Sequence, residues 1–392
     1  MKHYEYLIVG GGMAADAAAR GIRELDGAGH IGVLSADSDP PYTRPNLSKG
    51  LWKGRPMEKV WRKTEETGAE VLLNATVTEL DPTNKRVHDA RGEEYTYDKL
   101  LLATGGTPKR LQVGGDHIIY FRSLQDYRRL RKLADERERF LVIGAGFIGS
   151  EIAAALTMVG RKVTMLVRDR AIGGHMFPPE LADYVNDFYR QKGVDLITDT
   201  SAASIQEHAG RYTVRTDSGR SLEVGGIVAG IGIRPNVELA QAAGIKVEDG
   251  VVVDEHLRTS AEDIYAAGDA ANFFHSALGR RLRVEHEDNA LDMGKLAGRH
   301  MTGADQAYTH APMFYSDLFD LGYEAVGDTD SKLRTVSDWQ DGFKKGVIYY
   351  LQDGRVRGVL LWNVWKKVDQ ARALMAEAGD IRERDLKGRI AD

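Results

Sequence analysis

The sequence contains no cysteine among its 392 residues. The chain can therefore form no disulfide, no thiolate nucleophile and no cysteine-ligated zinc or iron–sulfur centre. Any redox chemistry must be carried by a group that the protein binds. We also expect no metal site.

Long apolar runs and a strong charge of one sign are missing as well. Runs such as "IAAALTMVG" are shorter than the roughly 20 residues that a membrane-spanning helix needs. The 53 basic and 58 acidic residues give a net charge of -5, which disfavours nucleic acid and anionic membranes as main partners. The chain enters an expected strand near its start, so we expect no targeting peptide and a cytoplasmic location.

A glycine-rich turn between an apolar strand and an alanine-rich helix occurs in "YEYLIVGGGMAADAAARGI". Gly10 allows the tight turn, Gly12 lets a pyrophosphate approach the backbone, and the small Ala15 lets the helix pack closely. Asp37 follows the next expected strand, "HIGVLS". The pattern is typical of a Rossmann unit, in which the helix N-terminus faces the phosphates.

The same unit is repeated in "RERFLVIGAGFIGSEIAAALTMVGRKVTMLV", with Gly144, Gly146 and Gly149 in the turn. Two complete strand–turn–helix–strand units imply two bound dinucleotides. In an oxidoreductase, two dinucleotides usually mean a flavin and a nicotinamide coenzyme.

Three later segments fit this architecture. "YDKLLLATGGTP" ends a buried-type strand at Thr104 and Gly105, and "GGIVAGIGIRPN" repeats that shape around Gly232. "IYAAGDAANF" delivers Asp269 to the carboxyl end of a short strand, where open sheets bind ligands. The alternative for Asp269 is the N-cap of a helix formed by "AANFF".

With these residues in view, the chain resembles the two-dinucleotide-binding-domain flavoproteins, which are pyridine nucleotide-disulfide oxidoreductase-like. It is most similar to the apoptosis-inducing-factor and ferredoxin-reductase types. The strings that carry the resemblance include "PPYTRPNLSKGLW", "RVEHEDNALDMGKLAGRHMTG", "MFYSDLFDLGYEAVG" and "GVIYYLQDGRVRGVLLWNVW". Relative to apoptosis-inducing factor, we expect no targeting stretch, and no long insert stands before "GVIYYL".

The resemblance implies an α/β fold with two Rossmann-type domains, the second inserted in the first, and a C-terminal α+β domain. We expect the FAD domain at 1–112 and 243–312, the NAD(P) domain at 113–242, and the C-terminal domain at 313–392. We predict that the charge-mixed segment 122–139 is a solvated helix.

The resemblance also places Lys49 beside the reactive edge of the flavin, paired with Glu151. A fixed ammonium there would stabilise the anionic reduced ring, by roughly 4 kcal/mol at about 4 Å and an effective dielectric near 20. His286 matches a histidine near both cofactors, and a structural helix cap is the alternative. Tyr315 stands where the family usually has a tryptophan that stacks near the flavin.

The candidate site residues divide by cofactor. Those expected to contact FAD are Gly10, Gly12, Ala15, Asp37, Arg44, Lys49, Thr104, Gly105, Asp269, His286 and Tyr315. Those expected to contact the nicotinamide coenzyme are Gly144, Gly146, Phe147, Ile148, Gly149, Glu151, Arg168, Asp169 and Gly232. Lys49, Glu151 and His286 are the candidate catalytic residues, and a core position is the alternative for Phe147. We expect Trp362 and Trp365 in the core of the C-terminal domain.

Two positions depart from the family pattern. The acid that usually holds the adenosine ribose of FAD is Ala36 here, so we expect Asp37 to replace it. In the second unit, Asp169 would accept hydrogen bonds from a ribose diol and favours NADH, whereas Arg168 would favour NADPH. The choice between NADH and NADPH stays open.

The predicted activity is transfer of electrons from NAD(P)H through FAD to a separate acceptor, without a redox cysteine. An iron–sulfur protein (ferredoxin or rubredoxin), a quinone and oxygen are the candidate acceptors. One alternative is the reductase component of an oxygenase system. Another is a slow NAD(P)H-responsive redox sensor or interaction protein. A homodimer is a possible assembly.

Overall fold

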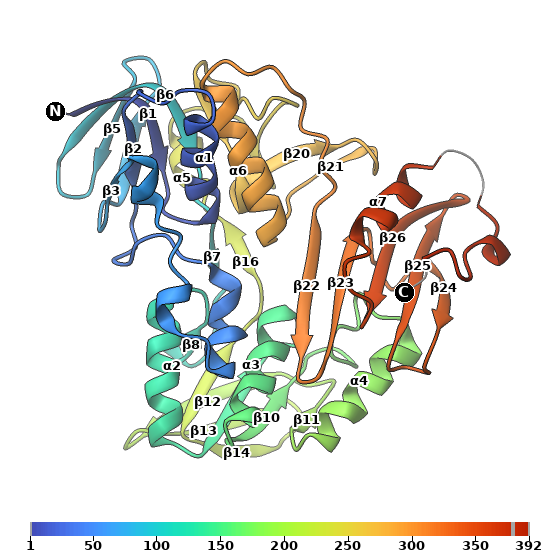
Figure 1. The fold of residues 1–392 in the computed structure, drawn as a ribbon. Coiled ribbons are helices and arrows are strands. Elements are labelled where there is room, and N and C mark those ends of the chain that lie inside the picture. The colour runs from blue at the N-terminus through green and yellow to red at the C-terminus, as the bar shows by residue number, and fades with distance from the viewer. Residues whose placement is uncertain (1, 378–380, 391–392) are drawn as a thin grey trace. The chain divides into compact units, whose positions relative to one another are not determined.

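The chain forms two compact units in the computed structural model, which describes residues 2–377 and 381–390 (Figure 1). The first unit runs from the N-terminus to Arg44 and includes Pro56–Thr107 and Arg234–Pro312. The second unit contains Pro45–Arg55, Pro108–Ile233 and the described residues from Met313 onward. The short segment Pro45–Arg55 therefore packs with the second unit, although the chain on both sides of it belongs to the first. The four sequence-based domain segments stay a prediction.

The first unit is built on a seven-stranded sheet of order β3-β2-β1-β6-β5-β4, with β19 paired to β6. β1, β2, β3, β6 and β19 are parallel, whereas β4 and β5 are antiparallel to their neighbours. The strands are β1 (Lys2–Val9), β2 (Ile31–Leu34), β3 (Glu70–Leu72), β4 (Val77–Asp81), β5 (Arg86–Asp89), β6 (Glu94–Leu102) and β19 (Ile264–Ala266). Buried apolar runs such as that of β2 are typical of parallel strands covered on both faces.

Helices α1 (Met13–Arg23) and α6 (Glu287–Met301) lie side by side in this unit (Figure 1). They approach closely because small residues face each other. A Cβ atom on Gly298 would lie 2.1 Å from the carbonyl oxygen of Ala18. The unit also contains α5 (Glu238–Ala242) and a four-stranded sheet of β17 (Val247–Glu248), β18 (Gly250–Val252), β20 (Ala271–His275) and β21 (Arg280–Leu282).

The second unit contains a parallel five-stranded sheet of order β11-β10-β9-β15-β8. The strands are β8 (Ile119–Tyr120), β9 (Arg139–Ile143), β10 (Lys162–Leu166), β11 (Asp195–Ile197) and β15 (Gly226–Ala229). Its helices are α2 (Leu124–Glu136), α3 (Phe147–Met158) and α4 (Pro179–Gln191). A smaller antiparallel sheet is formed by β12 (Ala202–His208), β13 (Arg211–Thr216) and β14 (Ser221–Val224). β7 (Gly106–Pro108) and β16 (Ile233–Pro235) form a separate two-stranded sheet.

The helix predicted within 122–139 is present as α2, but it is not wholly solvated. Leu124, Tyr127, Leu130 and Ala134 bury one face of it. These four residues recur at helical spacing, a pattern that predicts one buried face. The many charged residues of the segment obscured this pattern in the sequence.

The C-terminal part of this unit is an antiparallel sheet of order β22-β23-β26-β25-β24, packed against α7 (Val368–Ala376). The strands are β22 (Met313–Leu318), β23 (Leu321–Gly327), β24 (Arg334–Trp339), β25 (Gly346–Gln352) and β26 (Arg355–Trp362). Trp362 is fully buried here, as predicted. The prediction for Trp365 is wrong, because its side chain is 42% exposed.

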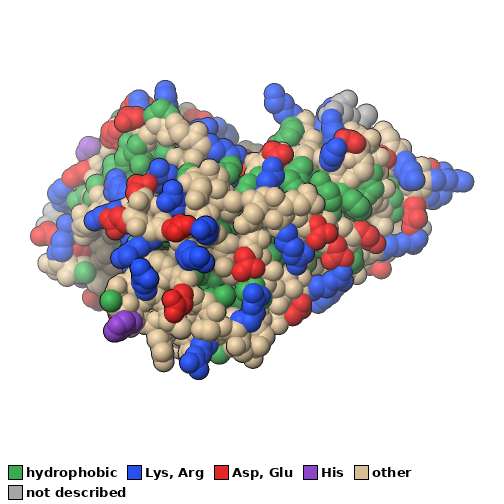
Figure 2. Space-filling view, turned by 90° about the horizontal axis from the view of Figure 1, so that it is seen from below, with side chains coloured by type: hydrophobic (Ala, Val, Ile, Leu, Met, Phe, Trp, Pro, Cys, Tyr) green, Lys and Arg blue, Asp and Glu red, His purple; other side chains and the backbone are tan. Residues whose placement is uncertain are grey.

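The two Rossmann-type sheets and the C-terminal α+β part confirm the predicted fold class. Within the described ranges 2–377 and 381–390, no helix is long and apolar enough to cross a membrane. On the face shown in Figure 2, Lys and Arg side chains are interspersed with Asp and Glu.

Candidate functional site

The first glycine turn lies in the first unit, between β1 and α1. Gly10 has φ +123° and its Cβ position lies 2.1 Å from the carbonyl oxygen of Ala103, so only glycine fits there. Gly12 occupies the N-cap of α1, and the nearest atom to its Cβ position is a guanidinium nitrogen of Arg44 at 4.0 Å. The fold requires glycine at Gly10, whereas the open space beside Gly12 suits a phosphate at the helix N-terminus.

The carboxyl ends of the neighbouring parallel strands bring further predicted residues to the same edge of this sheet. Thr104 and Gly105 follow β6, and Asp269 follows β19 in a short 3-10 turn, Gly268–Ala270. The side chain of Thr104 donates to the carbonyl of Asn236 at 2.7 Å, and the Asn236 amide donates back to the Thr104 carbonyl at 2.9 Å. The alternative for Asp269 is wrong, because "AANFF" forms β20 rather than a helix.

Asp37 follows β2, as predicted, and its carboxylate is already held by the protein. It accepts a hydrogen bond from the Tyr42 hydroxyl at 3.1 Å and one from the backbone N–H of Asp39 at 3.1 Å. The guanidinium of Arg44 lies 5.8 Å from the centre of the Tyr42 ring. Asp37 and Arg44 are thus both anchored through one tyrosine.

His286 occupies the N-cap position of α6. Burial lowers the pKa of His286 to about 4, against the opposing effect of the Asp269 and Asp288 carboxylates. The imidazole is therefore neutral near pH 7, where it can both donate and accept a hydrogen bond.

The second glycine turn lies in the second unit, between β9 and α3. The Cβ position of Gly144 (φ +106°) is 2.4 Å from the Gly230 carbonyl oxygen, and that of Gly149 is 2.1 Å from the Gly144 carbonyl oxygen. Gly146 caps α3, and nothing within the described residues lies within 4 Å of its Cβ position. This turn therefore resembles the first one. Close packing requires glycine at Gly144 and Gly149, whereas Gly146 has free space beside it.

The residues after β10 lie at the surface. The side chains of Arg168 and Asp169 are 84% and 71% exposed, and their charged groups are 3.8 Å apart. Val167, at the position of the usual acid, is buried. Gly232, with φ +92°, follows β15 at the same edge of the sheet. Both charged side chains can reach a ligand at this edge, so this geometry favours neither NADH nor NADPH.

Lys49 and Glu151 form the predicted ion pair in the second unit. Lys49 Nζ lies 2.8 Å from Glu151 Oε1, and the two side chains are 13% and 1% exposed. The ammonium also lies 4.9 Å from the centre of the Tyr315 ring. A nearly buried charge pair of this kind is held in place, because removal of one partner typically costs about 3–5 kcal/mol.

The segment that carries Lys49 is fixed by its tryptophan. Trp52 is buried, its indole N–H donates to the Leu47 carbonyl at 2.8 Å, and its ring packs edge-on against Tyr127 of α2 at 5.6 Å. The guanidinium of Arg131 covers the same ring at 5.4 Å. The segment has no α-helix or strand, as the prolines predict, but it forms two 3-10 turns, Arg44–Leu47 and Gly50–Lys53.

Two family profiles match the chain. The profile described as "Pyridine nucleotide-disulphide oxidoreductase" matches residues 4–294. The chain belongs to this family. The profile for the C-terminal part of mitochondrion-associated apoptosis-inducing factor matches residues 297–342 and 337–377.

Individual members of the family match over almost the whole chain. The chain is 33% identical to the 5,5'-dehydrodivanillate O-demethylase ferredoxin reductase subunit of a Sphingobium species, covering 100% of this chain and 97% of that protein. It is 31% identical to mitochondrial apoptosis-inducing factor 1 of Dictyostelium discoideum, covering 98% of this chain and 80% of that protein. The solved structure of a covalent putidaredoxin reductase–putidaredoxin complex matches with a TM-score of 0.89 at 28% identity, covering 96% and 93% of the two chains.

This pyridine nucleotide-disulphide oxidoreductase is an FAD-dependent enzyme that takes electrons from NAD(P)H and passes them onward. The predicted family, enzyme class and cofactors are confirmed. Despite the family's name, the chain itself contains no cysteine and can form no disulphide. The open positions at Gly12 and Gly146, each at a helix N-terminus, fit the pyrophosphates of two dinucleotides.

The structure gathers the predicted residues into two groups. The first unit holds Gly10, Gly12, Ala15, Asp37, Arg44, Thr104, Gly105, Asp269 and His286. The second unit holds Lys49, Gly144, Gly146, Phe147, Ile148, Gly149, Glu151, Arg168, Asp169, Gly232 and Tyr315. Among the residues that the structure describes, no cluster of side chains could hold a metal ion.

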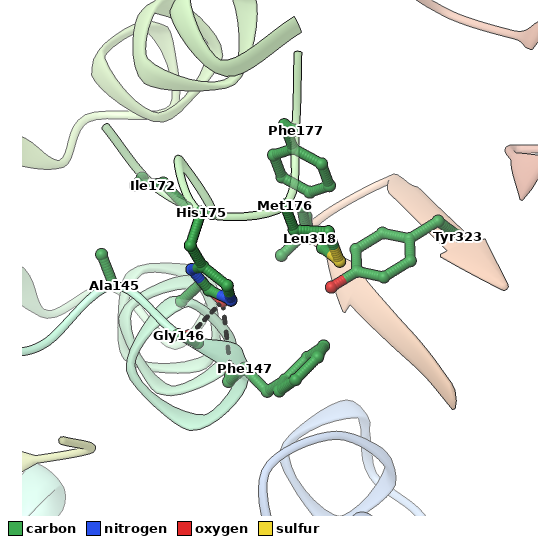
Figure 3. A pocket seen from close by; sticks show the side chains of 11 residues that line it. Ala145, Gly146, Phe147, Ile172, His175, Met176, Phe177, Leu318 and Tyr323 are labelled. Atoms are coloured by element: carbon green, nitrogen blue, oxygen red, sulfur yellow. Dashed lines mark hydrogen bonds between the residues drawn. The ribbon is translucent and has the colours of Figure 1, made fainter. Parts of the chain in front are cut away.

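A pocket beside the second glycine turn includes residues that the sequence analysis missed (Figure 3). In the close-up, the His175 ring and the Tyr323 hydroxyl point toward Gly146 and Phe147. The pocket is lined by Ala145, Gly146, Phe147, Ser150, Ile172, Gly173, His175, Met176, Phe177, Leu318 and Tyr323. Phe147, which could have been a core residue, is a lining residue of this pocket.

The loop that forms one wall of this pocket is held by the C-terminal sheet. Three successive carbonyls accept hydrogen bonds: Gly174 from the Ser331 hydroxyl at 2.8 Å, His175 from the Ser331 N–H at 2.9 Å, and Met176 from the Tyr350 hydroxyl at 2.8 Å. Phe177 packs edge-on against Tyr323 and Trp362, each at 5.5 Å. No local signal predicts these contacts, because the partners are far apart in the sequence.

Asp16 is a further residue that the sequence analysis missed. Its carboxylate is fully buried in α1 and accepts hydrogen bonds from Arg20 at 3.1 Å, Arg62 at 2.8 Å and Thr64 at 2.9 Å. The sequence offered one signal for this role, because a single carboxylate stands within an alanine-rich helix. The network ties the segment around Arg62 and Thr64 to the helix that begins at the first glycine turn.

Proposed function

We propose that this enzyme is the reductase component of an electron-transfer system and that its acceptor is a small iron–sulfur protein of the ferredoxin type. One observation carries the proposal: the chain matches a ferredoxin reductase subunit over 100% of its own length and 97% of that protein. The match to a reductase solved together with putidaredoxin supports it.

We infer that FAD is held by the first glycine turn and the carboxyl ends of its sheet, through Gly10, Gly12, Asp37, Arg44 and Asp269. When bound, FAD takes electrons from NAD(P)H and releases them to the acceptor, singly or in pairs. The open N-terminus of α1 would bind the pyrophosphate. Asp37 still has acceptor capacity for a ribose hydroxyl, since an ionised carboxylate offers about four lone-pair sites.

Lys49, in this proposal, stabilises the negative charge that develops on the reduced ring. The ion pair with Glu151 holds the ammonium in place before charge develops, so little reorganisation is needed. His286, neutral near pH 7, would donate or accept a hydrogen bond at the cofactors rather than supply charge.

The nicotinamide coenzyme, in turn, is held by Gly144, Gly146 and Gly149 and oriented by Phe147. Asp169 would bind the ribose diol of NADH. The exposed Arg168 would interact with the 2′-phosphate of NADPH. We propose NADH as the preferred coenzyme.

A second candidate function is a slow, ligand-responsive redox protein resembling apoptosis-inducing factor. The match of the C-terminal profile to residues 297–342 and 337–377 favours it. In this case NAD(P)H binding itself, rather than rapid turnover, would be the output, and oxygen or a quinone would discharge the enzyme slowly.

Stopped-flow absorbance with the FAD-loaded protein distinguishes the two functions. Rapid bleaching by NADH, followed by fast reoxidation by an added ferredoxin but not by oxygen, is the result expected for a reductase. A long-lived long-wavelength absorbance band that oxygen discharges only slowly, and that ferredoxin does not discharge faster, would overturn the proposal in favour of the sensor.

The cellular location and the oligomeric state belong to the proposal as well. We propose a cytoplasmic location and a homodimer. Fractionation of cells that produce the protein, and sedimentation with and without NADH, test them separately.

A further inference from the structure

Both carboxylate oxygens of Glu151 are bound by serine hydroxyls. Ser48 Oγ donates to Oε2 at 2.5 Å, and Ser316 Oγ donates to Oε1 at 2.6 Å, the oxygen that also faces Lys49. Ser48 and Ser316 are 4% and 0% exposed. The three donors come from separate parts of the second unit: the proline-rich segment supplies Ser48 and Lys49, and β22 of the C-terminal sheet supplies Ser316.

We propose that Ser48 and Ser316 are positioning residues that fix the Glu151 carboxylate in place, and that this carboxylate in turn fixes the Lys49 ammonium. This inference rests on the proposed role of Lys49 in flavin reduction. It gives the C-terminal sheet an indirect part in the reaction, through one hydroxyl of β22 that acts on Glu151.

The surroundings of Glu151 explain why two further donors are needed. A buried carboxylate is costly unless its lone pairs are satisfied, and Lys49 alone occupies only one oxygen. The other titratable groups that face it are Tyr189 of α4 and Tyr323 of β23. For both tyrosines burial, followed by the Glu151 charge, raises the pKa well above the usual range, so they stay neutral. The Tyr189 hydroxyl donates to the Ser150 carbonyl at 3.0 Å rather than to Glu151.

The same serine connects the ion pair to the pocket of Figure 3. Ser316 lies opposite Tyr323 in the β22–β23 pair, and the Tyr323 hydroxyl points toward the second glycine turn. Ser316 thus binds Glu151 and is paired in the sheet with a residue that lines the pocket.

The first test measures the rate constant of flavin bleaching by NADH in FAD-loaded Ser316→Ala and Ser48→Ala. With fewer donors, the Glu151 carboxylate should be held less firmly, and Lys49 should lose its fixed partner. We expect the limiting rate constant to fall about tenfold in each variant, with the Kd for NADH unchanged. Ser316→Thr, which keeps the hydroxyl, should restore most of the rate.

Thr200→Val is a matched control within the same unit. The buried Thr200 hydroxyl donates to the carboxylate of Asp217, so the variant also removes a hydroxyl–carboxylate bond, but away from Glu151. It should lower the melting temperature and leave the bleaching rate constant unchanged.

The second test needs no flavin. In the FAD-free protein, Ser316→Ala should lower the melting temperature, because a buried carboxylate loses a hydrogen-bond donor, and this loss should be smaller when Glu151→Gln is also present. For Thr200→Val the loss should be the same with and without Glu151→Gln.

The outcomes separate this inference from the proposed function. Wild-type rate constants in Ser48→Ala and Ser316→Ala, with slow bleaching in Lys49→Met, would overturn the positioning role alone. Wild-type rate constants in all three variants would overturn the role of Lys49 itself. If Ser316→Ala fails to fold, Ser48→Ala decides in the same way.

Discussion

At the scale of single residues, Lys49 lies in a setting that suits an electrostatic role. Its side chain is only 13% exposed and its ammonium contacts the Glu151 carboxylate and the Tyr315 ring. Lys53, four residues along the same segment, instead forms a half-exposed ion pair with Asp317 at 2.9 Å. Surface pairs of that kind typically contribute about 0–1 kcal/mol. The two lysines therefore form a natural pair of test and control.

Lys49→Met should keep FAD bound but slow its reduction by coenzyme at least tenfold, which corresponds to about 1.4 kcal/mol of barrier. The reason is that the fixed positive charge beside the developing negative charge is lost. Stopped-flow bleaching of the yellow protein measures the effect. Lys53→Met should bleach at the wild-type rate, and equal slowing in both variants would contradict the assignment.

The exposed Arg168–Asp169 pair after β10 allows the proposed preference for NADH to be tested. Asp169→Ala should raise the KM for NADH about tenfold, because the ribose diol loses its acceptor, and should leave the KM for NADPH nearly unchanged. Arg168→Ala should weaken only the binding of NADPH. Steady-state kinetics with each coenzyme measure both effects. If Asp169→Ala left the KM for NADH as it was, the NADH assignment would fail.

His286 predicts a pH dependence of stability. Its pKa falls from 6.5 to about 4 on folding, so between these values the unfolded chain binds more protons than the folded one. The stability contribution of the neutral imidazole is therefore fully present above pH 6.5 and is lost as the pH falls toward 4. The free energy of unfolding, measured in urea from pH 4.5 to 7.5, should rise less with pH in His286→Asn than in the wild type. An equal rise in both proteins would contradict the neutral histidine.

At the scale of elements, each glycine turn contains glycines that the fold requires and one glycine that leaves room for a ligand. Gly149→Ala would place a Cβ 2.1 Å from a backbone carbonyl oxygen, so it should destabilise the protein by about 1–3 kcal/mol, as overpacking does. Gly146→Ala should leave stability within about 0.5 kcal/mol. It should nevertheless raise the KM for the coenzyme, because the added methyl group occupies the space of the pyrophosphate.

Thermal melting and coenzyme titration of the two variants measure these effects independently. Gly160→Ala gives a poor control, because that glycine has φ +78°, whereas Gly27→Ala adds a methyl group in open space without such strain. A Gly146→Ala protein that melts early but binds coenzyme normally would show that this glycine serves the fold.

The elements show how far sequence reasoning reached. Both glycine turns, their flanking strands and the helix after His286 were predictable, because turn chemistry and apolar periodicity are local. The contact of Ser316 with Glu151 was not predictable, because 165 positions separate the two residues and a single serine carries no local signal. Trp365 was misplaced for a different reason. β26 ends at Trp362, and Asn363 has φ +51°, so the alternation that buries Trp362 does not continue.

At the scale of the whole molecule, the charge pattern limits how an acceptor can be recognised. Basic and acidic side chains are interspersed on the face of Figure 2, and the net charge is only -5. Long-range steering by one strong field is therefore not expected, because such steering needs a surface of one sign. Recognition should depend on short-range contacts and should vary little with salt.

FAD removal is the prediction that tests the molecule as a whole. A ligand that binds only the folded state at about 100 times its Kd adds roughly 2.7 kcal/mol of stability. For a protein of 392 residues, that corresponds to an increase of roughly 3 °C in melting temperature. The FAD-free protein should therefore melt lower than the yellow protein and should recover when FAD is added.

The variant Gly12→Ala makes this melting test specific. The nearest atom to its Cβ position is 4.0 Å away, so the FAD-free variant should melt at the same temperature as the FAD-free wild type. Added FAD should raise its melting temperature much less than that of the wild type. The methyl group fills the space at the N-terminus of α1 that the pyrophosphate needs. A Gly12→Ala protein that is stabilised by FAD as strongly as the wild type would show that FAD does not bind at this turn. The assignment of Gly10, Asp37 and Asp269 would then fail with it, since all of them lie at the same edge of one sheet.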